Sequence, residues 1–76
     1  MTRYQNLSGR SGVVEYEILD DSIDVKFGDG SIYTYTNVSA DPSHIKRMKD
    51  LATEGIGLNG FIDRYVKKNY SDKKRI

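Results

Sequence analysis

The sequence predicts an α+β fold, a three-stranded antiparallel β-meander covered on one face by two C-terminal helices. Three observations predict it. Apolar and polar residues alternate with a period of two over residues 13–36, apolar residues recur at helical spacing from residue 45 onward, and short turn sequences separate the strands. A chain of 76 residues suffices for one domain with a thin core.

Composition divides the chain into three parts. Residues 1–11 contain few apolar groups, and we expect a flexible N-terminal arm there. Residues 12–70 carry the strand and helix patterns and form the single domain. Residues 71–76 are polar and basic, and we expect a basic tail that frays.

The first hairpin joins strands predicted at 13–19 and 22–27. Its turn falls at residues 20–21, two aspartates that tolerate the backbone geometry of a short hairpin. A two-residue turn places Ile18 beside Ile23, so that the apolar residues of both strands share one face.

The second hairpin decides which face Tyr33 and Tyr35 occupy. A two-residue loop at 29–30 would turn both tyrosines outward. A three-residue loop at 28–30, with Gly30 in a left-handed bulge, would place them opposite the apolar residues of the preceding strand. The burial of two aromatic rings favours the second alternative and makes them residues at the rim of the core.

Two helices follow the strands. Asp41-Pro42 is typical of a helix start, and Gly55 is a suitable left-handed cap for its end. The apolar face of this helix comprises Ile45, Met48, Leu51 and Ala52. We expect Asn59 to cap a second helix that ends near Asn69 or Tyr70. Its apolar face comprises Phe61, Ile62, Tyr65 and Val66.

Charge is distributed unevenly, although the net charge is only +1. Residues 15–41 hold seven acidic residues and one lysine, whereas residues 42–76 hold nine basic and four acidic residues. A solvated surface explains this asymmetry, and so does a basic face for phosphate or another acidic partner.

The order of these signals resembles the KTSC domain, a short bacterial module named for the C-terminus of some lysyl-tRNA synthetases. Its Tyr-x-Tyr motif is matched by 33–35, after a strand that ends in Phe27 and a glycine turn. Residues 57–59 resemble the family's break before its closing helix. The family has an aromatic residue early in the first helix, where this chain has His44. RNA binding has been suggested for the family, and no activity is established for it.

Little in the sequence indicates an enzyme or a cofactor, and we expect neither. The lone His44 lacks a recognisable catalytic motif and reads as a surface residue. Asp20, Asp21 and Asp24 lack a calcium-binding loop and are explained by a turn and a strand. Residues 55–60 match a dinucleotide-binding glycine pattern in part only and follow a helix, so we interpret them as a helix–helix corner.

The leading functional hypothesis is a small binding module for RNA or single-stranded nucleic acid. Tyrosines stack on bases and basic side chains contact phosphates. The alternatives for these residues are core packing and solubility. The candidate residues are Tyr33, Tyr35, Arg64, Lys67, Lys68, Lys73, Lys74 and Arg75.

The rival hypothesis is a protein-interaction or homodimerisation module. It would use a sheet edge, or an outer sheet face with Val13, Leu19, Ile32 and Val38. The chain has no cysteine, no apolar signal segment and no stretch that could cross a bilayer. We therefore expect a cytoplasmic protein that does not enter a membrane.

Overall fold

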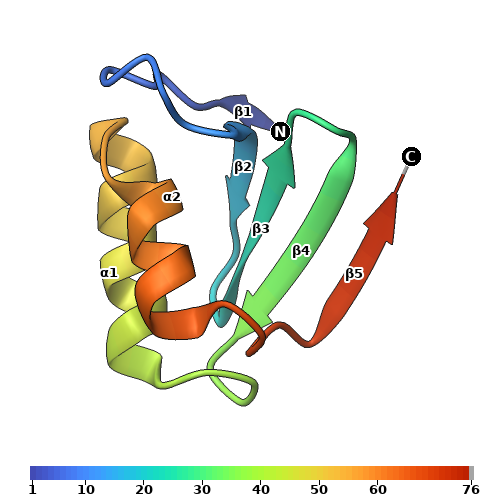
Figure 1. Ribbon diagram of the computed structural model, residues 1–76. Coiled ribbons are helices and arrows are strands. Elements are labelled where there is room, and N and C mark those ends of the chain that lie inside the picture. The colour runs from blue at the N-terminus through green and yellow to red at the C-terminus, as the bar shows by residue number, and fades with distance from the viewer. Residues whose placement is uncertain (76) are drawn as a thin grey trace.

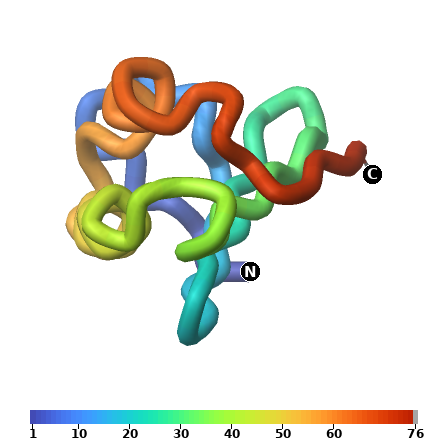
Figure 2. Tube along the Cα trace, turned by 90° about the horizontal axis from the view of Figure 1, so that it is seen from below, coloured from blue at the N-terminus to red at the C-terminus, as the bar shows by residue number. Residues whose placement is uncertain are grey.

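The computed structural model describes residues 1–75, and in it helices pack on one face of an antiparallel sheet (Figure 1). The sheet has five strands in the order β1-β2-β3-β4-β5. Figure 2 shows the helices gathered over one side of the sheet, while the C-terminal segment continues past them to β5. The elements are β1 (Thr2–Arg3), β2 (Val13–Ile18), β3 (Ser22–Phe27), β4 (Ser31–Thr36), α1 (Pro42–Glu54), α2 (Leu58–Phe61), the π-helical η1 (Ile62–Val66) and β5 (Asp72–Arg75).

The α+β class is confirmed, but the prediction of three strands was wrong. The three predicted strands are present as β2, β3 and β4, and two short strands extend the sheet at its edges. Thr2 pairs with Tyr16 at one edge, and Arg75 pairs with Ser31 at the other. Both additions lie in the terminal segments, where all residues of β1 and β5 are exposed. Exposed residues on both faces leave no period-two pattern to detect.

The N-terminal segment is also attached beyond β1. Tyr4 is only 3% exposed and belongs to the core. The Leu7 N–H donates to the carbonyl oxygen of Gly55 at 2.8 Å. The composition of residues 1–11 indicated a flexible arm, whereas the structure places a strand and a buried aromatic ring there.

The registers of both hairpins are as predicted. Ile18 pairs with Ile23, and across the second hairpin Ile23 pairs with Tyr35. Gly30 has a φ of 91°, and its N–H donates to the Phe27 carbonyl at 3.0 Å. The three-residue loop with a left-handed bulge at Gly30 is therefore confirmed, and both tyrosines of β4 face the helices.

The first helix also follows the prediction. The Asp41 carboxylate accepts a hydrogen bond from the Ser43 N–H at 2.8 Å, and Gly55 ends α1 with a φ of 80°. The second helix differs, because its N-cap is Gly57 and its regular structure ends at Val66. Asn59 lies inside α2, and its side-chain oxygen accepts a hydrogen bond from the Gly12 N–H at 2.9 Å.

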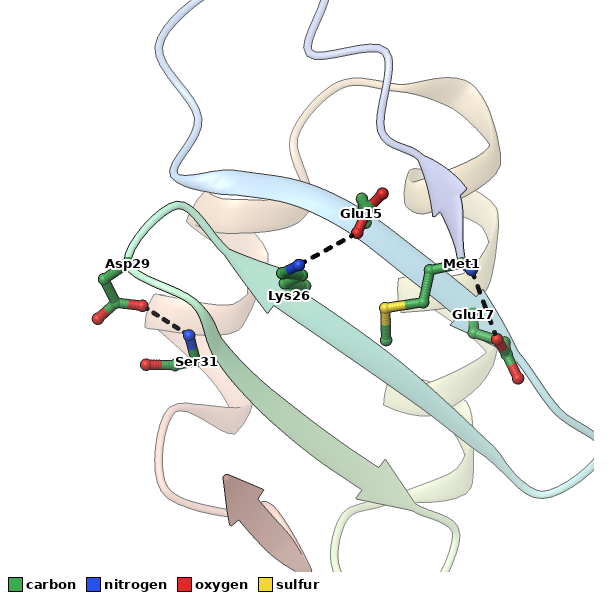
Figure 3. A network of polar contacts seen from close by, with 6 residues as sticks. All are labelled: Met1, Glu15, Glu17, Lys26, Asp29 and Ser31. Carbon is green, nitrogen blue, oxygen red and sulfur yellow. Dashed lines mark hydrogen bonds and ion pairs between the residues drawn. The ribbon is translucent and has the colours of Figure 1, made fainter. Parts of the chain in front are cut away.

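Of the four residues that the interaction hypothesis placed in an apolar patch on the outer sheet face, Val13 and Ile32 are buried, whereas Leu19 and Val38 are exposed. Val13 is 1% exposed and packs in the core, after which the register of β2 shifts before Glu15. Ile32 is on the outer face but only 5% exposed. Figure 3 shows this face crossed by the ion pair of Lys26 and Glu15 at 3.6 Å. No helix within residues 1–75 is long and apolar enough to cross a bilayer.

Candidate functional site

A cleft of about 260 Å³ lies between β4 and the second helical segment. We call it the tyrosine cleft. Its wall combines aromatic and aliphatic side chains with two carboxylates, a serine and a lysine. The lining residues are Phe27, Asp29, Ser31, Tyr33, Tyr35, Ile62, Asp63 and Lys67.

Packed aromatic rings form the floor of the tyrosine cleft. The ring of Tyr33 lies edge-to-face with Phe27 at a centroid distance of 5.4 Å and with Tyr70 at 5.0 Å. It stacks on Tyr35 at 6.4 Å. Such pairs stabilise the fold beyond the area that they bury. The floor is therefore a cluster of packed aromatic rings that is continuous with the core.

The two tyrosines of the Tyr-x-Tyr motif differ in exposure. Tyr35 is 1% exposed, so it is a core residue rather than a rim residue. Burial raises the pKa of its hydroxyl above the usual value, and the neighbouring Tyr33, Tyr70 and Asp63 raise it further. Tyr33 is half-buried and is the residue of the pair that reaches the cleft surface.

Cationic side chains border the exposed part of Tyr33. Lys73 pairs with Tyr33 across β4 and β5, and its Nζ lies 5.2 Å from the centre of the Tyr33 ring. The pKa of Lys73 is raised through its hydrogen-bonding contact with the Tyr33 side chain. Lys67 borders the cleft from the C-terminal end of η1. One lysine therefore lines the tyrosine cleft and another lies beside the Tyr33 ring.

Two carboxylates provide acceptors at the cleft. The Asp29 carboxylate accepts the Ser31 N–H at 2.9 Å and the Arg75 guanidinium at 2.9 Å (Figure 3 shows the contact with Ser31). The hydrogen bonds from Ser31, and then Arg75, lower the pKa of Asp29 to about 2. Asp63 is exposed and accepts a hydrogen bond from the Asn59 amide at 3.2 Å.

The structure brings together five of the eight predicted site residues. Tyr33, Tyr35, Lys67, Lys73 and Arg75 lie in or beside the tyrosine cleft. The others do not line it. Arg64 lines a separate groove, Lys74 pairs with Ile32 and so faces the opposite side of the sheet, and Lys68 is exposed beyond η1.

Sequence reasoning missed the two carboxylates of the cleft. Asp63 and Lys67 are four residues apart, a spacing that puts them on one side of a helix and could have suggested a shared site. No comparable signal linked Asp29 to them, because it reaches the cleft only through the packing of the second hairpin beside η1.

The other titratable residues in the described part of the chain form no metal centre. Within residues 1–75 there is no group of three or more histidine, aspartate or glutamate residues that could hold a metal ion. His44 packs against Phe61 and Tyr65, at ring distances of 5.7 and 5.3 Å.

The groups that line the tyrosine cleft complement a planar ring with polar edges. Its floor is apolar, its carboxylates accept hydrogen bonds, and its lysines donate them. The chain matches no protein-family model, no curated protein and no solved structure.

Proposed function

We propose that the protein is a non-enzymatic module that binds single-stranded nucleic acid, and RNA in particular. The observation that carries this proposal is the tyrosine cleft, in which Lys67 and Lys73 flank an aromatic floor. Nonspecific single-strand binders combine positive charge along the backbone path with aromatic contacts to bases. The resemblance to the KTSC domain, a bacterial module, and a cytoplasmic location belong to the same proposal.

The size and polarity of the cleft suit one nucleobase. Pockets for drug-sized ligands measure roughly 300–1,000 Å³, and the 260 Å³ here suits a smaller group. Asp29 and Asp63 can accept hydrogen bonds from the exocyclic amino groups of bases. The same two carboxylates repel any anionic group, so the cleft favours a neutral base and leaves the phosphates outside it, at the lysines.

Only one of the two tyrosines can stack on a base. Tyr35 is too buried for its ring to meet a base, and it supports the floor. Tyr33 exposes part of its ring, over which Lys73 lies. A base therefore enters beside Tyr33, while the lysine turns outward to its phosphate.

The phosphate contacts come from exposed lysines on neighbouring elements. Lys67 and Lys68 follow one another at the end of η1, and Lys73 comes from β5. None of the three has an ion-pair partner within the described part of the chain. Their charges are thus available to a strand that runs from η1 to β5.

The test is fluorescence anisotropy of a labelled single-stranded RNA of ten nucleotides at low salt. We expect the double variant Lys67→Ala, Lys73→Ala to bind at least tenfold more weakly. Lys46→Ala is the matched control, because Lys46 is exposed on α1 and pairs with Asp50 at 3.9 Å. The proposal fails if the wild-type protein does not bind at tens of micromolar, or if the control weakens binding equally.

A second candidate function rests on β5, which is one of the two exposed edge strands of the sheet. An extended partner segment can add to such an edge through backbone hydrogen bonds. Two copies pairing edge to edge would bring Lys73, Lys74 and Arg75 of each against the other, which disfavours a homodimer. The partner would therefore be acidic. A monomer in light scattering, with β5 amide shifts on addition of an acidic peptide but not RNA, would support this alternative.

A further inference from the structure

A second recess lies on the other side of η1 from the tyrosine cleft. It measures about 440 Å³, and we call it the arginine groove. Arg47 and Leu51 of α1 form one wall, and Gly60, Phe61, Arg64 and Tyr65 of α2 and η1 form the other. Both charged residues that line it are arginines, which distinguishes it from the tyrosine cleft with its two aspartates.

An aromatic group borders the arginine groove. Phe61 and Tyr65 are four residues apart, and their ring centroids are 4.7 Å apart. His44, in the first turn of α1, lies 5.3 Å from Tyr65 and completes the group. Tyr65 is 49% exposed, so a large part of its ring meets solvent rather than the core. An exposed ring that contacts two other aromatic rings is suited to stacking.

The two guanidinium groups are uncommitted within residues 1–75. Arg47 and Arg64 are both exposed, and neither takes part in an ion pair or a side-chain hydrogen bond among those residues. They come from two different helices and approach the same groove. A guanidinium offers a planar fork of donors that matches the oxygens of a phosphate.

The carboxylates next to these arginines in sequence are engaged elsewhere. Asp50 pairs with Lys46, and Asp63 accepts the Asn59 amide and lines the tyrosine cleft. The arginine groove therefore combines positive charge with an exposed aromatic ring, and among residues 1–75 no carboxylate lines it. An aromatic ligand that carries a phosphate complements both features.

We propose that the arginine groove binds a nucleoside monophosphate, with the phosphate between Arg47 and Arg64 and the base stacked on Tyr65. The site uses no residue of the tyrosine cleft and goes beyond the function proposed for it. The same chemistry is offered by a free mononucleotide and by the phosphorylated end of a strand. Gly60 leaves the groove open, since a Cβ at this position would meet nothing within 4 Å.

The test is an NMR titration of the full chain with AMP, with adenosine and inorganic phosphate as separate arms. We expect the amide signals of Gly57, Gly60 and Tyr65 to shift, and AMP to bind at least tenfold more tightly than either part. Equal affinities for AMP and phosphate would overturn the proposal. So would shifts confined to Ser31 and Asp63, an outcome that would instead support the function of the tyrosine cleft.

Substitutions separate the contributions of the arginine charges, the Tyr65 ring and the open space at Gly60 to AMP binding. Arg47→Ala and Arg64→Ala should each weaken AMP binding about tenfold, which corresponds to about 1.4 kcal/mol, whereas Lys46→Ala should not. Tyr65→Phe should keep the preference for AMP over phosphate, and Tyr65→Leu should abolish it. Gly60→Glu should block the groove, with Gly60→Ala as its control. Unchanged AMP affinity in Gly60→Glu would refute the location.

A further titration decides whether the ligand is a free mononucleotide or the phosphorylated end of a strand. A four-nucleotide RNA with a 5′-phosphate is compared with AMP and with the same RNA without the phosphate. Tighter binding of the phosphorylated strand at Gly60 identifies a strand end, and equal binding of AMP identifies a free nucleotide. No binding of either phosphorylated ligand at millimolar concentration overturns the proposal.

Discussion

The backbone N–H of Leu58 donates a hydrogen bond to the hydroxyl of Tyr4, which lies 54 residues earlier in the chain, at 3.2 Å. Leu58 is the first residue of α2, where backbone N–H groups lack partners within the helix. The N-cap residue is Gly57, which has no side chain to accept from them. Tyr4 therefore provides the cap from the other end of the protein.

Removing this cap should destabilise the fold. Tyr4→Phe keeps the buried ring but leaves a buried N–H unpaired, which costs about 1–3 kcal/mol. Tyr4→Ala should cost about 3–5 kcal/mol, because it also removes the ring from the core. Urea unfolding measures both. Tyr65→Phe is the control, since Tyr65 is exposed. A Tyr4→Phe variant as stable as wild type would show that this hydrogen bond contributes nothing.

The bulge at Gly30 should tolerate no side chain without cost. Gly30→Ala places a Cβ on a residue with a φ of 91°, and we expect a loss of about 1–2 kcal/mol. Gly28 in the same loop is a matched control. It has no positive φ, and its nearest neighbours leave a Cβ 3.8 Å of room. Equal stability of the two variants in thermal unfolding would contradict the role of Gly30.

Alanine substitutions at the two glycines on either side of the start of the second helix should change the stability of the protein in opposite directions. Gly60→Ala should stabilise the protein by about 0.5–1 kcal/mol, because Gly60 is inside α2 and its Cβ would meet nothing within 4 Å. Gly55→Ala should destabilise it, because Gly55 has a φ of 80° and its Cβ would lie 2.6 Å from that of Gln5. Melting temperatures decide the signs, and a lower value for Gly60→Ala would contradict this prediction.

Stability should depend on pH through Asp29. Its pKa in the folded protein is about 2, below the ordinary value of 3.8. A lowered pKa contributes stability that is fully present above the unfolded value and is lost as the pH falls. The loss attributable to Asp29 should therefore occur between about pH 4 and pH 2. Asp29→Asn should flatten the unfolding free energy over this interval, whereas Asp72→Asn should not.

Nucleic-acid binding should weaken with salt in proportion to the number of phosphate contacts. Three contacts to a single strand predict a log–log slope near −2, at about −0.7 for each contact. The double variant Lys67→Ala, Lys73→Ala should reduce the slope to about −0.7. Anisotropy titrations at several potassium chloride concentrations measure it. An unchanged slope would mean that these lysines do not contact phosphates.

The central strands and α1 could be predicted because their signals are local. The alternation in β3 specifies a buried face with Ile23 and Val25, and Asp41-Pro42 specifies where α1 begins. In β2 the register shift before Glu15 buries Val13 and leaves Val14 exposed. The start of the second helix was less predictable. Asn59 has the side chain of a cap, but its oxygen accepts the Gly12 N–H, and that contact depends on the tertiary structure.

The candidate site could be predicted in part only. Lys73 and Lys74 are adjacent lysines that the sequence alone cannot distinguish. Pairing of β5 with β4 places Lys73 beside Tyr33 and Lys74 on the opposite face of the sheet. The turn of the helix likewise places Lys67 in the tyrosine cleft and Arg64 in the arginine groove. A basic composition cannot distinguish these positions, because they depend on register and rotation.

The sequence by itself determined the orientation of the Tyr-x-Tyr pair. Gly30 favours a loop with a residue at positive φ, and the burial of the two rings selects the three-residue loop that turns them toward the helices. Only the tertiary structure decided that β1 and β5 join the sheet and that Tyr4 caps α2. Every residue except proline carries a backbone N–H and C=O, so pairing at a sheet edge leaves little trace in the side chains. It depends instead on which segments the folded core brings together.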